Sequence, residues 1–200
     1  MSLQRKIVFS SAFVTLMLCF TFLPSQPNGF VQRDHFRKNE ATKQIAAFLK
    51  EQTKRLSDDD ASVIAKIVYE ESQKKNLDYR LVLAIMKIES NFRHDVISRK
   101  GARGLLQVKP SLAKYIARDV GVQWKDDSTL DEPAMNIKIG VHHFSSLIDD
   151  FESVSMALHA YHVGPTRLRE IVADKKKPEK RYLNLVLDEY KRNKSVLPPP

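Results

Sequence analysis

Glu89 is the residue in this chain best placed for acid chemistry, because it ends the apolar stretch Leu81–Glu89. Lys87 is the only other charged residue there, so a helix over this stretch would be apolar on nearly every side, and such helices are usually buried. Burial penalises the charged form of a carboxyl group and raises its pKa. Glu89 is therefore a candidate general acid, although most glutamates at helix ends are solvated or act as caps.

An acid that stays protonated near neutral pH can deliver a proton to the leaving oxygen of a glycosidic bond. Many glycosidases pair such an acid with a second carboxylate. Asp95 is the nearest candidate partner, but it has no helical spacing from Glu89 and lies in the glycine-containing, basic loop Asn91–Gly104. We therefore interpret Asp95 as a structural or surface residue.

Four motifs that follow one another along the chain extend this interpretation beyond a single carboxylate. They are ESNF at Glu89–Phe92, SRKGARGLLQVKP at Ser98–Pro110, MNIKIGVHHF at Met135–Phe144 and ALHAYHVGP at Ala157–Pro165. In this order the motifs resemble the Slt-type (family 1) lytic transglycosylases of the goose-type-lysozyme-like superfamily, over roughly residues 60 to 190. The resemblance implies an all-α, lysozyme-like catalytic domain.

The resemblance implies that Glu89 is the single catalytic acid and base for cutting the β-1,4 bond between N-acetylmuramic acid and N-acetylglucosamine in peptidoglycan. Glu89 would protonate the leaving oxygen and then accept the proton of the muramyl 6-hydroxyl, leaving a 1,6-anhydro end. That hydroxyl and the substrate's acetamido group would take the place of a second carboxylate. Two alternatives stay open: a muramidase-type hydrolase of the same fold, and a non-catalytic peptidoglycan-binding or assembly protein.

The resemblance also implies a set of residues around Glu89. Ser90 would orient the acid or the acetamido group, and Gln107 would form a hydrogen bond with the substrate. Gly101 and Gly104 would let the backbone turn tightly beside the sugar. The remaining candidates are Tyr161, near the acid, His162, and Asn136, which is either a ligand contact or a structural hydrogen-bonding residue. Each also has a plainer interpretation: a helix end for Ser90, a loop tie for Gln107 and a core aromatic for Tyr161.

Several positions depart from the family's motifs. Leu106 stands where methionine is usual, which is a nearly volume-conserving exchange. His143 and Phe144 occupy the place of a common Tyr-Leu pair. His162 replaces an asparagine, and an imidazole differs from an amide in shape and titrates near neutral pH. We expect the substrate contact or the pH dependence of the reaction to be altered at His162.

The elements that must position these residues are predicted to be helices throughout. Ser57, three residues before Asp60, and Asp78 are helix caps by type and position, and Pro110 and Gly121 bracket a further helix. No stretch alternates over enough residues to predict a sheet. We expect an all-α domain behind an N-terminal hydrophobic segment, divided as follows: residues 1–30, signal peptide or membrane anchor with linker; 31–56, helical lead-in; 57–194, catalytic domain; 195–200, Pro-rich tail.

The uncharged stretch Ile7–Leu23 follows Arg5 and Lys6 and is about as long as a short membrane-spanning helix. A secretory signal has a shorter apolar region and a small-residue cleavage site, and no clean Ala-x-Ala follows here. We therefore favour an uncleaved anchor over a signal peptide, with the remainder of the chain outside the cytoplasm. The expected location is a bacterial cell envelope, where the domain is periplasmic and either anchored to the inner membrane or secreted.

The charge balance favours a polyanionic partner, since 33 Lys and Arg stand against 24 Asp and Glu, for a net charge of +9. The motifs make peptidoglycan glycan strands the expected partner, with the membrane as a second if Ile7–Leu23 is uncleaved. Gly101–Gly104 is similar to the Gly-x-x-Gly loop of KH nucleic-acid modules. Those modules have flanking strands and lack an export segment, whereas this sequence predicts no strands and begins with an apolar segment. We expect no nucleic-acid partner, and the oligomeric state stays open.

The six histidines do not predict a metal site. His142 and His143 are adjacent and His159 lies three residues before His162, but the His-Glu-x-x-His pattern is absent and no acidic residue completes a set of ligands. Cys19 is the only cysteine, which excludes an intramolecular disulfide and a cysteine-based metal site. We expect neither a metal nor a cofactor.

Overall fold

A computed structural model describes residues 29–200 of the chain. The predicted signal peptide or anchor, Ile7–Leu23, lies outside these residues. The chain divides into a unit of residues 1–36 and a compact unit of residues 37–200, and the second unit carries every candidate site residue. Among the helices of residues 29–200, none combines the length and apolar character that crossing a membrane requires.

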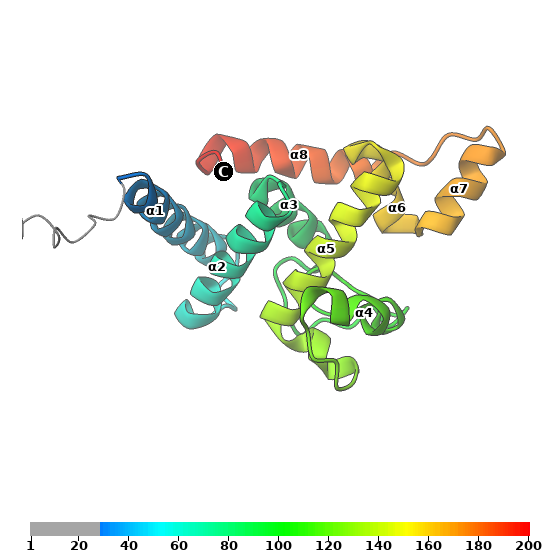
Figure 1. Cartoon of the computed structure of the whole chain (residues 1–200). Coiled ribbons are helices and arrows are strands. Elements are labelled where there is room, and N and C mark those ends of the chain that lie inside the picture. Colours follow the sequence, from blue (N-terminus) through cyan, green and yellow to red (C-terminus); the bar gives the residue numbers. More distant parts are fainter. Residues whose placement is uncertain (1–28) are drawn as a thin grey trace, which may run out of the picture. The chain divides into compact units, whose positions relative to one another are not determined.

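The described residues form helices joined by loops, as predicted (Figure 1). Two isolated bridges, Ile97 with Arg103 and Arg103 with Val108, are the only β-type pairing among residues 29–200. The elements are α1 (Gly29–Gln52), α2 (Asp58–Lys74), α3 (Tyr79–Ser90), α4 (Pro110–Ile116), the 3-10 helices η1 (Ala117–Val120) and η2 (Asp127–Asp131), α5 (Pro133–Phe151), α6 (Val154–Val163), α7 (Pro165–Ala173) and α8 (Arg181–Val196).

The helix starts follow the capping residues that the sequence supplies. The Ser57 hydroxyl accepts a hydrogen bond from the Asp60 backbone N–H at 3.0 Å, and the Asp78 carboxylate accepts one from the Arg80 backbone N–H at 2.9 Å. Each bond satisfies one of the donors that a helix leaves free in its first turn. The start of α3, and with it the position of Glu89 at the other end, is thus fixed by local sequence.

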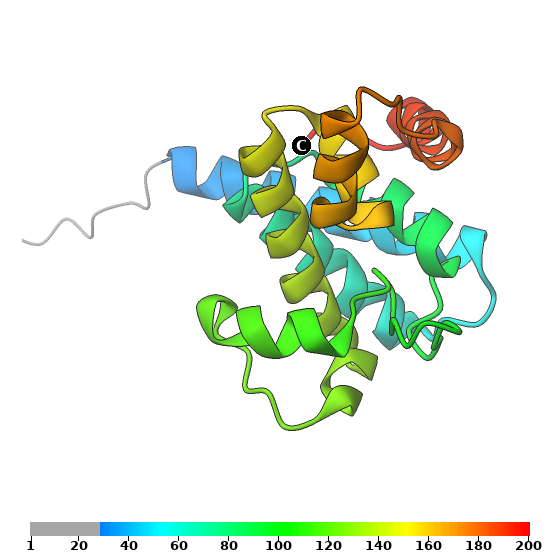
Figure 2. The same ribbon diagram turned by 90° about the vertical axis from the view of Figure 1, so that its right-hand side faces the viewer.

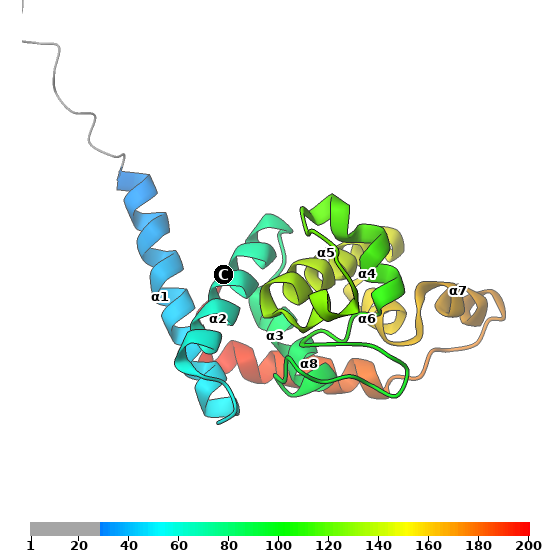
Figure 3. The same cartoon turned by 90° about the horizontal axis from the view of Figure 1, so that it is seen from below.

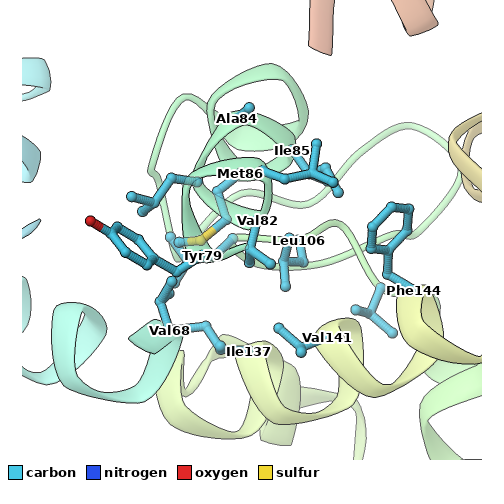
Figure 4. Packing of buried hydrophobic residues seen from close by; sticks show 14 of the residues in the cluster. Val68, Tyr79, Val82, Ala84, Ile85, Met86, Leu106, Ile137, Val141 and Phe144 are labelled. Atoms are coloured by element: carbon cyan, nitrogen blue, oxygen red, sulfur yellow. The ribbon is translucent and has the colours of Figure 1, made fainter. Parts of the chain in front are cut away.

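Helix α3 is the centre of the core, and its residues from Leu81 to Met86 are all buried. Figure 4 shows side chains of α3 facing Leu106 from the following loop and Ile137 and Val141 from α5. Burying an aliphatic side chain of this size contributes about 1.5–3 kcal/mol. The expectation of a helix that is apolar on nearly every side and buried is confirmed.

Helix α5 packs against α2 on one side and α6 on another, as the rotated view shows (Figure 2). It thereby joins the early helices to the later ones. Gly140 allows the close approach of α5 to the loop after α3, because a Cβ at this position would overlap the Leu106 side chain. The loop that follows Glu89 is therefore pressed against the middle of α5.

Helix α8 lies along α3 (Figures 1 and 3). The Tyr190 hydroxyl donates to Oδ2 of Asp78 at 2.7 Å, and Nδ2 of Asn193 donates to the Arg80 carbonyl at 2.9 Å. Leu197 is buried after the helix ends, and the Tyr79 hydroxyl donates to the Pro198 carbonyl at 2.6 Å. The final residues therefore secure α8 on α3.

Candidate active site

The carboxyl group of Glu89 lies near the end of α3 and is partly buried. Its Oε1 atom accepts a hydrogen bond from the Tyr182 hydroxyl at 2.6 Å. Burial raises the pKa of Glu89, and this effect outweighs the hydrogen bond from Tyr182, which acts in the opposite direction. Among the described residues, no cation pairs with Glu89. The group is therefore held in the environment that a general acid needs.

Tyr182 is a hydrogen-bond partner of Glu89 that the sequence did not indicate. It stands in the first turn of α8 and is buried, and it meets Glu89 across a sequence separation of 93 residues. Burial raises its pKa well above the ordinary tyrosine value, and the nearby Glu89 adds to the rise. From the sequence, Tyr182 was only an aromatic residue at the start of an amphipathic helix, and nothing in its neighbours pointed to Glu89.

Tyr161 lies close enough to Glu89 for the carboxylate to raise its pKa, after burial as the larger cause. Its hydroxyl donates to the Leu106 carbonyl at 2.7 Å, and its ring meets Phe144 edge-on at a centroid distance of 5.8 Å. His143 contacts the same ring, and burial lowers the pKa of His143 to about 4. Tyr161 thus links the acid's surroundings to the loop that follows α3.

Asn136, in the first turn of α5, is the residue that fixes this loop. Its Oδ1 accepts from the Leu106 backbone N–H, and its Nδ2 donates to the carbonyls of Arg103 and Leu130, each at 2.9 Å. The side chain is completely buried, so it has no surface left for a ligand. Of the two roles that the sequence left open for Asn136, the contacts describe the structural one.

The two loop glycines occupy different surroundings. Both have a positive φ, 75° at Gly101 and 74° at Gly104, which L-residues rarely adopt. A Cβ on Gly104 would also overlap the Asn136 amide and the Leu130 carbonyl, whereas a Cβ on Gly101 would meet nothing. Gly104 is therefore required by close approach as well as by conformation, and Gly101 by conformation alone.

Gln107 and Ser90 both make internal hydrogen bonds. Nε2 of Gln107 donates to the carbonyls of Val96 and Gly104 at 3.1 and 2.9 Å, while its Oε1 has no partner among the described residues. Ser90 is buried and donates to the Met86 carbonyl one turn earlier, at 3.1 Å. The Gln107 side chain therefore ties the loop together and keeps one acceptor free.

His162 stands in the last turn of α6, exposed, with its ring stacked on that of Tyr182. The ring centroids are 4.3 Å apart and the planes differ by 11°. Partial burial lowers the pKa of His162. The structure thus brings His162, Tyr161 and Tyr182 to the surroundings of Glu89.

Asp95 is exposed and makes no hydrogen bond or ion pair with any other residue of the described chain. These surroundings agree with its interpretation as a surface residue. Within residues 29–200, no group of three or more His, Cys, Asp or Glu side chains is arranged to hold a metal ion.

The described residues thus form a helical domain whose central helix, α3, carries the partly buried Glu89 near its end. The chain belongs to the transglycosylase SLT domain family, whose model matches residues 66–184, more than half of the sequence. The resemblance found in the four sequence motifs is therefore confirmed, and so is the lysozyme-like helical fold.

Individual relatives match the same part of the chain. A transglycosylase of Enterobacteria phage PRD1 is 32% identical over 116 residues, which cover 58% of this chain and 40% of the phage protein. An endo-type membrane-bound lytic murein transglycosylase A of Citrobacter koseri is 33% identical over 125 residues, which cover 56% of this chain and 60% of that protein. This chain therefore spans less than two thirds of the length of either relative.

A solved structure of similar fold is an inactive glutamate-to-glutamine variant of the lytic transglycosylase Slt from Pseudomonas aeruginosa. It superimposes with a TM-score of 0.51 and 26% sequence identity, over 64% of this chain and 22% of the Pseudomonas chain.

Proposed function

We propose that this protein is a peptidoglycan lytic transglycosylase that uses Glu89 as its single general acid and base. The observation that carries the proposal is the state of the Glu89 carboxyl group: burial raises its pKa, and the one hydrogen bond that it receives from residues 29–200 comes from an uncharged tyrosine. Membership of the transglycosylase SLT domain family supports the same chemistry. The substrate bond is the β-1,4 link from N-acetylmuramic acid to N-acetylglucosamine.

The reaction needs two proton transfers at one carboxyl group. Protonated Glu89 gives its proton to the glycosidic oxygen as the bond to the anomeric carbon breaks, and becomes a carboxylate. The carboxylate then accepts the proton of the muramyl 6-hydroxyl as that oxygen bonds to the anomeric carbon. The product is a 1,6-anhydromuramyl end, no water is consumed, and Glu89 returns to its protonated form.

Tyr182 supports this assignment because it gives the two carboxyl oxygens of Glu89 different surroundings. Because the phenol donates to Oε1 of Glu89, the acid proton belongs on Oε2, which accepts no hydrogen bond among the described residues. A carboxylic acid with one oxygen held and the other free can present its proton in a fixed direction. The hydrogen bond also stabilises the carboxylate that forms after the first transfer.

The substrate contacts belong to the same proposal. The free Oε1 of Gln107 can accept a hydrogen bond from a sugar hydroxyl or acetamido N–H. Ser90 is buried and already donates within α3, so its contribution is to hold the end of the helix that carries Glu89. Glycan strands of peptidoglycan are the proposed partner, and the cell envelope, outside the cytoplasm, is the proposed location.

The test is a digestion of purified peptidoglycan by the full chain and by its Glu89→Gln variant. Glu132→Gln serves as the control, since Glu132 is exposed and its side chain makes no capping hydrogen bond. Mass spectrometry of the products should find anhydromuramyl ends from the unaltered chain and from the control, and none from Glu89→Gln.

The other outcomes decide between the alternatives. Reducing ends that have gained one water would identify a muramidase-type hydrolase of the same fold. Polymer left intact by the unaltered chain, together with sedimentation of the chain with peptidoglycan, would identify a binding protein. Equal activity of Glu89→Gln and the unaltered chain would refute the role of Glu89.

A further inference from the structure

Three helices meet at the acid through one short series of contacts. His162 from α6 stacks on Tyr182 from α8, and Tyr182 donates its hydroxyl hydrogen to Glu89 from α3. The stack is nearly parallel, with an angle of 11° between the planes. His162 is exposed whereas Tyr182 is buried, so the imidazole covers the phenol ring from the outer side.

The hydrogen bond to Glu89 depends on where the Tyr182 ring is held. A hydrogen bond weakens steeply when the donor tilts away from the acceptor, and a tyrosine side chain rotates about two bonds. Tyr182 lies in the first turn of α8, directly after the mostly exposed segment 174–180 that joins α7 to α8. The stacked imidazole of His162 therefore supports the side chain of Tyr182 at the start of α8.

We propose, in extension of the function proposed above, that His162 is a positioning residue. Its ring holds the Tyr182 phenol in place so that Oε1 of Glu89 stays bonded and the acid proton is directed to Oε2. The position usually holds an asparagine in the family that the motifs resemble, and an asparagine has no aromatic ring to stack. This chain thus supports the acid by a contact that the usual residue does not offer.

The proposal requires the ring of His162 and not its charge. Lys100 and Glu179 are the charged groups that act on His162, with opposite effects on its pKa, and His159 lies near it on the same helix. Because partial burial lowers the pKa of His162, the ring that stacks at neutral pH is the uncharged imidazole. A phenylalanine at position 162 should therefore preserve the positioning of Tyr182, whereas an alanine should not.

The kinetic test compares His162→Phe, His162→Ala, Tyr182→Phe and the double variant His162→Ala/Tyr182→Phe in the full chain acting on peptidoglycan. His162→Ala and Tyr182→Phe should each lower kcat about 3- to 10-fold with KM nearly unchanged. The first loses one aromatic pair, and the second loses one hydrogen bond to Glu89. The double variant should lose no more than Tyr182→Phe alone, because His162 acts through Tyr182. His162→Phe should keep most of the activity.

Val163→Ala is the matched control, since Val163 is the exposed neighbour of His162 at the end of α6. It should leave kcat and KM unchanged. A raised KM in both His162→Phe and His162→Ala would overturn the proposal, because it would mean that the imidazole contacts the substrate. Losses that multiply in the double variant would also overturn it.

A second measurement does not depend on activity. Carbon-13 NMR titration of the Glu89 carboxyl group, assigned by its absence in Glu89→Gln, reports the hydrogen bond directly. Tyr182→Phe should raise the pKa of Glu89 because it removes the hydrogen bond that lowers this pKa, and His162→Ala should raise it because it loosens the same bond. His162→Phe should not raise it. Failure of the unaltered chain to cut peptidoglycan would refute the proposed function, while this titration would still decide the positioning role.

Discussion

Replacing Asn136 by alanine is predicted to release the loop that follows α3. The Asn136 side chain bonds three backbone groups: the Leu106 N–H and the carbonyls of Arg103 and Leu130. Alanine can make none of these bonds. Two of the three contacts are fully buried, so water cannot readily take the place of the amide.

The expected cost follows from those three groups. A buried donor or acceptor that loses its partner costs about 1–3 kcal/mol, and the partly buried Arg103 carbonyl costs less. The sum is about 3–5 kcal/mol. For a protein of this size, 1 kcal/mol shifts the melting temperature by about 2–4 °C. Asn136→Ala should therefore melt about 6–20 °C lower than the unaltered chain.

The assay combines thermal unfolding with hydrogen exchange at the Leu106 backbone N–H, which donates a hydrogen bond to Oδ1 of Asn136. Asn184→Ala is the matched control, because Asn184 is an exposed asparagine in a helix and its side chain forms no hydrogen bond with any residue of the described part of the chain. The control should melt within about 2 °C of the unaltered chain. If Asn136→Ala melts as the control does and the Leu106 amide stays protected, the structural role of Asn136 is refuted.

Three further predictions concern the stability of the site and its helices. Burial raises the folded-state pKa of Glu89, so the contribution of Glu89 to stability is fully present below its unfolded-state pKa and is lost as the pH rises through its folded-state pKa. Glu89→Gln should therefore stabilise the protein by on the order of 1 kcal/mol at pH 8 and by less near pH 4, as measured by urea unfolding. An equal gain at the two pH values would contradict the raised pKa of Glu89. Gly104→Ala should cost more than about 2 kcal/mol and Gly101→Ala about 1–2 kcal/mol, since both need a positive φ but only the first would also overlap its neighbours; equal losses in denaturant unfolding would refute the close approach. Deleting residues from Leu197 onward should lower the melting temperature by about 4–16 °C. The deletion removes the buried Leu197 and the hydrogen-bond acceptor of Tyr79, which should reduce the free energy of unfolding by about 2–4 kcal/mol. An unchanged melting temperature in calorimetry would mean that these residues do not secure α8.

The sequence determined the local features of the fold because these depend on residues a few positions apart. Ser57 and Asp78 are caps by type and position, and both accept the backbone hydrogen bonds expected of them. The apolar stretch that ends at Glu89 predicted a buried helix, and the core confirms it. A raised pKa of Glu89 followed from the same stretch, since desolvation is its main cause.

The sequence alone could not identify the residues that contact Glu89 or hold the loop after α3. Tyr182 and Glu89 are separated by 93 residues, and an amphipathic pattern tells which face of a helix is buried but not which element covers it. The placement of Tyr182 depends on the docking of α8 along α3, through bonds such as that from Tyr190 to Asp78. The stack of His162 on Tyr182 depends on α6 and α8 meeting at the same end of α3.

Asn136 and Gln107 illustrate the same limit within the sequence motifs. Their types and positions marked both as candidates, but an amide side chain can bind a ligand or backbone groups equally well. Only the tertiary structure placed Asn136 fully inside, with its hydrogen bonds made to the loop, and left one oxygen of Gln107 free. The sequence therefore determined that Glu89 ends a buried apolar helix, whereas the packing of distant helices decided what surrounds Glu89. The physical reason is that a long-range contact is fixed by the whole fold and not by the neighbouring residues in the chain.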